Sequence, residues 1–291
     1  MERSKRTAES ATAGDLNLPA SRLSRRFLAW VFRSPSRIRA SMTVLPLVNI
    51  GRLGRLGEAF PWTSPARNNI RYLPINKSIA TEDAVLPYMV IHEFIEEAAD
   101  LVIMDFCGCR KAGRCEHYPE DLGCLFMGKS AHDIPGDVSH RASRAEAHAH
   151  VERAVAAGLV PLVGKVRIDN FIFLTPDRGR LLSVCFCCHC CCMMRSFKGV
   201  PAALLDRVIR PLEGVEVEVR AEACRGCATC VETCPFDAIS IVDGKAVHGP
   251  SCRKCGRCER FCPNGAVRMD WDAGRFPRNV IESIGKKVKL D

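Results

Sequence analysis

Two cysteine runs with identical spacing lie 28 residues apart in the C-terminal part of this 291-residue chain. Each has the form C-x2-C-x2-C-x3-C-P, and the eight thiols are Cys224, Cys227, Cys230, Cys234, Cys252, Cys255, Cys258 and Cys262. Ala238 and Ile239 recur as Ala266 and Val267, so the repeat extends beyond the cysteines. Four thiols within eleven residues cannot all fill a hydrophobic core. The repeat therefore predicts a small module that folds around bound metal.

This spacing suits cubane iron–sulfur clusters, which need four thiolates on alternate corners. Cysteines at every third position of a tight loop reach three corners of one cluster, while the fourth, followed by proline, points to the other cluster. Zinc is the alternative, but zinc ribbons use two separated C-x2-C pairs. We therefore assign one 4Fe-4S cluster to Cys224, Cys227, Cys230 and Cys262, and a second to Cys252, Cys255, Cys258 and Cys234.

Residues 216–272 resemble the bacterial two-cluster ferredoxins, and every ligand position of that family is present. The resemblance implies a ferredoxin-like fold in which two neighbouring clusters relay single electrons at low potential. Basic residues lie in or beside the cysteine loops: Arg225, Arg253, Lys254, Arg257 and Arg260. Because positive charge favours the reduced cluster, they should raise the potentials. They also indicate a docking face for an acidic redox partner, with a role in solubility alone as the alternative.

The 18 cysteines are clustered, and the first 106 residues contain none. Disulfide-rich proteins are usually small secreted domains, so this distribution favours metal ligation in a reducing compartment. A twin-arginine-like run at residues 24–28 lacks the apolar stretch that export requires, and no apolar segment is long enough to span a bilayer. We therefore expect a cytoplasmic protein.

The net charge of +9 arises largely from residues 1–41, which we expect to form a basic tail. One interpretation is a solvated, partly disordered segment. The other is an arm that contacts an acidic partner or an anionic membrane surface, with an apolar side made of Leu28, Trp30, Val31 and Phe32. No stacking aromatics alternate with the arginines, so nucleic acid is not an expected partner.

Residues 42–215 are expected to form a cysteine-rich domain of helices and short strands. Apolar periodicity predicts helices over 86–104, 143–157 and 201–210, and Ser143 with Glu146 makes a capping box. Strands are predicted at Leu159–Val166, Asn170–Leu174 and Leu181–Cys187, with a winged-helix shape as one option. The fold class is thus α+β, followed by the two-cluster ferredoxin-like domain at 216–272 and a short basic tail at 273–291.

Ten further cysteines precede the ferredoxin-like region in two groups: Cys107, Cys109, Cys115 and Cys124, then Cys185, Cys187, Cys188, Cys190, Cys191 and Cys192. Six free thiols in eight residues would be an oxidation hazard, so we treat all ten as candidate ligands. The simplest interpretation is a further iron–sulfur cluster or a pair of metals shared by the two groups. A zinc site and a relay of redox-active thiols remain open. His189 is the only plausible histidine ligand, and His92, His148 and His150 are expected to have surface or packing roles.

The runs Asp105–Arg110 and Asp121–Leu125, followed by the cysteine-rich string, resemble the front half of uncharacterised ferredoxin-fused proteins of anaerobic bacteria and archaea. That resemblance spans roughly residues 75–272 and implies no particular reaction. The predicted function is electron transfer through the two clusters and the further centre. One alternative is an oxidoreductase whose cysteine-rich site reduces a substrate such as a disulfide, fed by the ferredoxin module. Another is an activation or assembly factor for a different metalloenzyme. No catalytic residue is identified.

Overall fold

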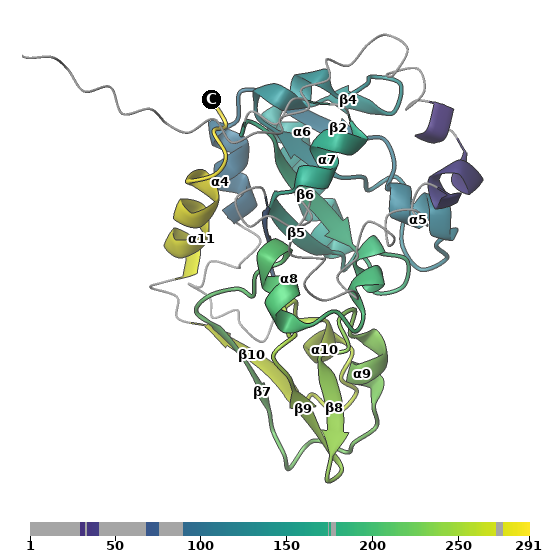
Figure 1. Ribbon diagram of the computed structural model, residues 1–291, viewed down its shortest axis with the longest axis vertical. Helices are drawn as coiled ribbons and strands as arrows, with labels where there is room; N and C mark the ends of the chain where they lie inside the picture. Colours follow the sequence, from purple (N-terminus) through teal and green to yellow (C-terminus); the bar gives the residue numbers. More distant parts are fainter. Residues whose placement is uncertain are drawn as a thin grey trace, which may run out of the picture.

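A computed structural model describes residues 30–32, 34–40, 68–75, 90–173, 175, 179–271 and 276–291. These residues form a mixed α+β structure with two parts (Figure 1). The larger part is a six-stranded sheet with helices on both sides. The smaller part contains two two-stranded sheets and the repeated cysteine loops. Among the helices described, none has the length and apolar character needed to cross a membrane.

The large sheet has the strand order β1-β5-β6-β3-β2-β4, and every neighbouring pair is antiparallel. Its strands are β1 (Asn69–Tyr72), β2 (Leu101–Met104), β3 (Leu125–Met127), β4 (Ser139–Arg141), β5 (Val160–Lys165) and β6 (Leu182–Cys187). Alternate residues of a strand face opposite sides. Leu101 and Ile103 accordingly belong to a larger hydrophobic core, whereas Val102 and Met104 belong to a smaller one on the other face.

Helices cover both faces of this sheet. On the larger core, α4 (Val90–Glu97) and α6 (Arg144–Ala156) pack against each other. The start of α6 is as predicted, because the Ser143 hydroxyl accepts the backbone N–H of Glu146 at 3.2 Å. On the smaller core lies α7 (Arg167–Ile172), together with Phe32. The connections contain the short helices α5 (Gly108–Gly113) and η5 (Lys129–Asp133).

The smaller part begins and ends on one antiparallel pair, β7 (Val215–Val219) with β10 (Val267–Trp271). Between them lie α9 (Thr229–Thr233), β8 (Ile239–Val242), β9 (Lys245–His248) and α10 (Arg257–Arg260), and β8 pairs with β9. The two parts are joined through η6 (Met193–Phe197) and α8 (Ala202–Val208). Just after α8, the N–H of Arg210 donates to the carbonyl of Ile70 in β1 at 2.9 Å. Backbone contact therefore ties the connection to the edge of the large sheet.

Two predicted elements have a different structure. The helix expected over 86–104 ends at Glu97, and residues 101–104 form β2, because their four consecutive apolar side chains supply both cores. In the strand expected at Asn170–Leu174, residues 170–172 instead form the end of α7, and Ile172 and Phe173 both contact the smaller core; Leu174 lies outside the described residues. Adjacent residues of a strand would point to opposite faces. The antiparallel sheet also replaces the winged-helix option.

Residues expected to be tails take part in packing. The segment 273–291 contains α11 (Phe276–Gly285), which lies alongside α4 with Val280 and Ile284 buried (Figure 1). At the other end, Phe32 stacks on Phe173 at a centroid distance of 5.9 Å, so it is not available to a membrane surface. Trp30 is 54% exposed, and Leu28 lies outside the described residues.

Candidate metal and cluster sites

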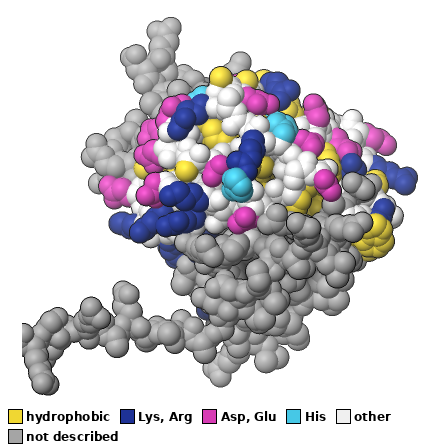
Figure 2. Space-filling model, turned by 90° about the horizontal axis from the view of Figure 1, so that it is seen from above, with side chains coloured by type: hydrophobic (Ala, Val, Ile, Leu, Met, Phe, Trp, Pro, Cys, Tyr) yellow, Lys and Arg dark blue, Asp and Glu magenta, His cyan; other side chains and the backbone are white. Residues whose placement is uncertain are grey.

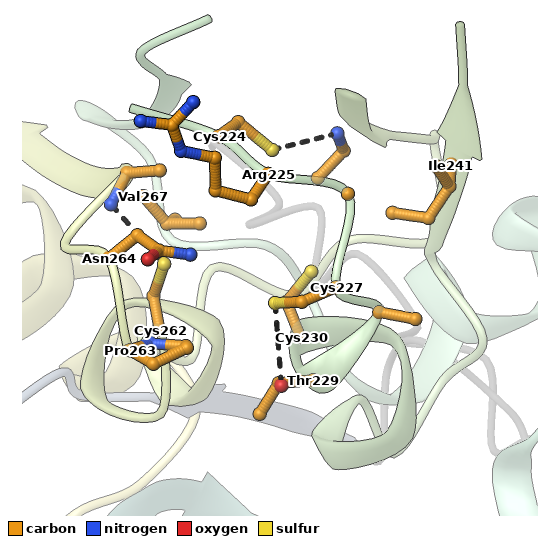
Figure 3. A pocket seen from close by; sticks show the side chains of 14 residues that line it. Cys224, Arg225, Cys227, Thr229, Cys230, Ile241, Cys262, Pro263, Asn264 and Val267 are labelled. Atoms are coloured by element: carbon orange, nitrogen blue, oxygen red, sulfur yellow. Dashed lines mark hydrogen bonds between the residues drawn. The ribbon is translucent and has the colours of Figure 1, made fainter. Parts of the chain in front are cut away.

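One cavity in the ferredoxin-like region is lined by Cys224, Cys227, Cys230 and Cys262, whose sulfur atoms point into the same space (Figure 3). Three of these cysteines come from the loop after β7 and the start of α9, and the fourth follows α10. The remaining lining includes the apolar side chains of Ile241, Ala246 and Val267. The cavity contains about 310 Å³ of free space, including its open side.

A second cavity, of about 330 Å³, is lined by Cys234, Cys252, Cys255 and Cys258. Here the cysteine from the first run follows α9, and the other three belong to the second run. Each cavity thus takes three cysteines from one run and the last cysteine from the other run. The side chains of Phe236, Ile239 and Val217 complete an apolar wall.

The backbone of the two cysteine loops repeats as the sequence does. Left-handed φ angles occur at Gly226 and Lys254, at Ala228 and Gly256, and at Asp237 and Gly265. Members of each pair stand 28 residues apart, and only one of each pair is glycine. Left-handed residues next to right-handed ones turn successive N–H groups toward one concave side, which binds anions. The loop shape therefore suits a negatively charged cluster.

Backbone N–H groups also approach the thiols directly. The N–H groups of Ala238 and Ala266 lie 3.4 and 3.2 Å from the Sγ atoms of Cys234 and Cys262, in equivalent positions of the two repeats. The N–H groups of Gly226 and Ala246 lower the pKa of Cys224, because they stabilise its thiolate. Such hydrogen bonds favour the deprotonated form that binds iron.

The two cavities differ in exposure. Among the cysteines, all of which the structure describes, only Cys227 of the first cavity is exposed. In the second cavity, burial raises the pKa of Cys252 to about 11. Phe236 of this cavity packs edge-on against Tyr72 of β1 at a centroid distance of 6.0 Å. The first cavity therefore faces solvent, and the second faces the large sheet.

The basic residues of the cysteine loops divide into two groups. Arg225 and Arg260 are exposed, but Arg253 and Arg257 are only 1% and 2% exposed, so these two are not part of a docking face. Arg253 pairs with Asp206 of α8 and donates to the carbonyl of Ile209 at 2.8 Å. The sequence offered no signal for this burial, because arginines in a loop are ordinarily solvated.

Arg257 lies between the second cavity and the front cysteines. Its Nη2 is 3.4 and 3.3 Å from the carbonyl oxygens of Cys187 and Cys188, and its Nη1 is 3.8 Å from the Sγ of Cys255. Burial disfavours its charge, but Tyr72 and the surrounding thiols outweigh burial and raise the pKa of Arg257. The guanidinium is thus a fixed positive charge between the two cysteine-rich regions.

The front cysteines fall into one quartet and three pairs. The Sγ atoms of Cys115, Cys188, Cys190 and Cys191 all lie within 4.8 Å of one another. Cys124 and Cys185 approach to 3.3 Å. The thiols of Cys107 and Cys109 hydrogen-bond to each other, as do those of Cys187 and Cys192. The fold therefore brings together both sequence groups, which lie far apart in the chain.

Arg110, which is fully buried, lies among the front cysteines. It donates to the carbonyl oxygens of Phe186, at 2.8 Å, and Leu122. Burial disfavours its charge, but the thiols of Cys107 and Cys188 raise the pKa of Arg110. In turn, the hydrogen bond from Cys109, together with Arg110, lowers the pKa of Cys107 to about 6. Arg110 and Cys109 thus favour the thiolate form of Cys107.

The histidines lie outside these thiol groups. His189 is not part of the quartet, and its Nδ1 lies 3.0 Å from the hydroxyl of Tyr118. His150 is buried with its Nε2 2.9 Å from the carbonyl of Gly123. His92 and His148 stack on each other between α4 and α6. These contacts give all four histidines packing or hydrogen-bonding roles.

A third cavity, of about 910 Å³ and open to solvent, lies at the opposite end of the molecule and was not predicted. It is lined by His132, His140 and Arg141 among others, and contains no cysteine. Hydrogen bonds from His140 to Asp105, at 2.7 Å, and Glu146 raise the pKa of His140. Figure 2 shows this end, where acidic, basic and histidine side chains are interspersed.

Comparison with known families identifies part of the smaller region. Residues 217–240 match the 4Fe-4S binding domain family. This stretch contains the first cysteine run, and the chain therefore carries an iron–sulfur binding domain in its C-terminal part. No match was found among curated proteins.

Proposed function

We propose that this protein transfers single electrons through two 4Fe-4S clusters and a further metal or redox centre among the front cysteines. The observation that carries the proposal is the composition of the two cavities, each of which is lined by four cysteines. Four thiolates fill the outer positions of a cubane, so no substrate position remains. Such closed clusters exchange electrons rather than bind substrates.

The first cluster is the terminal that exchanges electrons with partner proteins. Its ligand Cys227 is exposed, and Arg225 lies beside it in the same cavity wall. Three exposed apolar side chains of the adjacent hairpin, Ile241, Val242 and Val247, provide a contact surface. An apolar contact with a positive charge beside it fits a partner that is acidic at its docking face.

The second cluster connects this terminal to the front cysteines. Its cavity packs on Tyr72, and Arg257 links the Sγ of Cys255 to the carbonyl of Cys188. A positive charge here stabilises the reduced cluster, so an electron is held close to the front region. Electrons thus travel from the exposed end of the molecule to the cysteine-rich part.

The proposal is tested by reductive titration of the anaerobically purified chain. Dithionite should bleach the visible iron–sulfur absorption with uptake of about two electrons per chain, one for each cubane, and of a third electron where the further centre is redox-active. Ferricyanide should restore the absorption, and the reduced protein should show the EPR spectrum of two magnetically interacting clusters. An absorption that does not respond to dithionite, or a protein without a reduced-cluster signal, would refute electron transfer.

A further inference from the structure

Four thiols of the front region form a compact group that no cubane fits. Cys115 follows α5, and Cys188, Cys190 and Cys191 belong to the turn after β6. Their four Sγ atoms lie within 4.8 Å of one another, and those of Cys115 and Cys190 are 3.5 Å apart. Neither cysteine quartet of the ferredoxin-like region meets the same limit, although the structure describes all eight of those residues.

The size of this quartet indicates what it can bind. In a tetrahedral complex with metal–sulfur bonds of about 2.3 Å, the sulfur atoms stand about 3.8 Å apart. A cubane binds each thiolate to a different iron, so the iron–iron separation holds its thiolates much farther apart. The front quartet therefore has the dimensions of a site for one ion, whereas each ferredoxin-like quartet lines a cavity and does not meet this distance limit.

The local backbone has the features of a metal-binding turn. Cys188 and Cys191 are spaced C-x2-C, and the N–H of Cys191 lies 3.3 Å from the Sγ of Cys188. Gly113 of α5 allows the second segment to approach, since a Cβ at this position would lie 2.9 Å from the Sγ of Cys191. The two segments are thus held as closely as a shared ion requires.

Positive charge surrounds this turn. Arg257 donates to the carbonyl of Cys188 at 3.3 Å, and Arg195 donates to the carbonyl of His189 at 2.9 Å. Four thiolates around a divalent ion carry a net charge of about −2, which these guanidinium groups offset. Four uncharged thiols would carry no negative charge for the two guanidinium groups to offset.

We propose that Cys115, Cys188, Cys190 and Cys191 bind a single thiophilic divalent ion, Zn²⁺ or Fe²⁺, in tetrahedral coordination. With four protein ligands the site is closed, which is typical of structural metal centres. The ion would hold the turn 188–191 in place, and this turn contacts the ferredoxin-like region through Arg257 and through Phe261, which lies 4.6 Å from His189 between ring centroids. The inference rests on the further metal centre of the proposed function, but its test does not depend on the two clusters. Iron in this site could also relay electrons, whereas Zn²⁺, which has no redox chemistry, would only hold the turn in place.

The test measures zinc, iron and acid-labile sulfide in the anaerobically purified full-length chain. We expect about one equivalent of metal beyond the iron that the sulfide content accounts for. The double variant Cys188→Ser/Cys191→Ser should lose this equivalent and keep its sulfide. The matched variant Cys124→Ser/Cys185→Ser, which alters a close thiol pair outside the quartet, should keep both.

X-ray absorption spectroscopy on the unaltered chain provides a readout that does not require a variant to fold. If the extra metal is zinc, the extended fine structure (EXAFS) above the zinc edge should show about four sulfur neighbours near 2.3 Å and no metal neighbour. If it is iron, the oxidised protein should give the EPR signal of isolated high-spin ferric iron.

Three results would overturn the inference. The first is a loss of about four sulfides together with iron in the Cys188→Ser/Cys191→Ser variant, which would mean a cubane. The second is the absence of any metal beyond the clusters, with a thiol count that reveals a disulfide in the quartet. The third is an extra metal that the quartet variant retains. Sulfide content reports on the clusters separately, so failure of the proposed function is distinguishable from failure of this site.

Discussion

At the scale of single residues, Asp169 of α7 is a buried carboxyl group whose Oδ2 has no hydrogen-bond partner among the described residues. Burial raises the pKa of Asp169 from 3.8 to about 6, although Ser183 acts in the opposite direction. Because the folded-state pKa is raised, the stability associated with this group is fully present below about pH 4 and is lost as the pH rises through about 6.

Asp169→Asn should therefore stabilise the fold at pH 8 by about 3 kcal/mol. The difference from the unaltered protein should shrink as the pH falls toward 5, because the native carboxyl group becomes protonated. Anaerobic urea denaturation at several pH values measures this, with the exposed Asp121→Asn as control. The account of Asp169 would be contradicted if both substitutions changed the free energy of unfolding equally, or if the effect of Asp169→Asn grew at low pH. Either result would show that burial does not raise the pKa of Asp169.

Arg257 is the residue that we expect to set the potential of the second cluster. Arg257→Gln removes a buried positive charge near Cys255 and should lower one of the two reduction potentials by roughly 50–100 mV. The reduction potential of the Arg257→Lys protein should lie between those of the Arg257→Gln protein and the unaltered protein. Arg260→Ala should have little effect on the potentials, because Arg260 is exposed and water and salt screen its charge. Potentiometric titration, with iron content as a check on folding, measures the shift. Unchanged potentials in a fully loaded Arg257→Gln protein would contradict the assigned role.

At the scale of elements, Cys234, which follows α9, lines the second cavity, and Cys262, which follows α10, lines the first. This arrangement predicts which cysteines bind the same cluster. Cys224→Ala/Cys227→Ala should leave about four irons per chain in cubanes. Adding Cys262→Ala should remove no more, because that cysteine lines the same cavity.

The matched triple variant carries Cys234→Ala in place of Cys262→Ala and should lose the second cluster as well, since Cys234 lines the other cavity. Iron and sulfide analysis of both triple variants distinguishes the assignments. The reverse order of losses would show that each cluster is held by a single cysteine run.

The elements also show what can be read from a sequence. The capping pair Ser143 and Glu146 located α6, because a helix start depends on neighbouring residues alone. The sequence predicts helix for Leu101–Met104, which form a strand, because a short apolar run has the same pattern in a helix and in a strand buried on both faces. The 28-residue spacing suggested how the eight ferredoxin-type cysteines divide. The partner of the 188–191 turn could not be predicted, because Cys115 reaches it only through the order of strands in the sheet.

At the scale of the whole molecule, the cysteines form a sequence of sites that begins at an exposed thiol. Cys227 is exposed at the first cavity, the second cavity lies against Tyr72, and the front quartet lies beyond Arg257. The larger hydrophobic core extends through both parts of the chain, from Leu125 and Val184 of the large sheet to Phe236 and Val267 of the smaller part.

Acid-labile sulfide per chain tests the central claim most directly, because only the clusters contain it. After anaerobic purification we expect about eight sulfides per chain, in step with about eight cluster irons. About four would mean that one cysteine quartet holds no cluster, and about twelve would place a third cubane among the front cysteines. Either result would contradict two cubane clusters combined with a single-ion site.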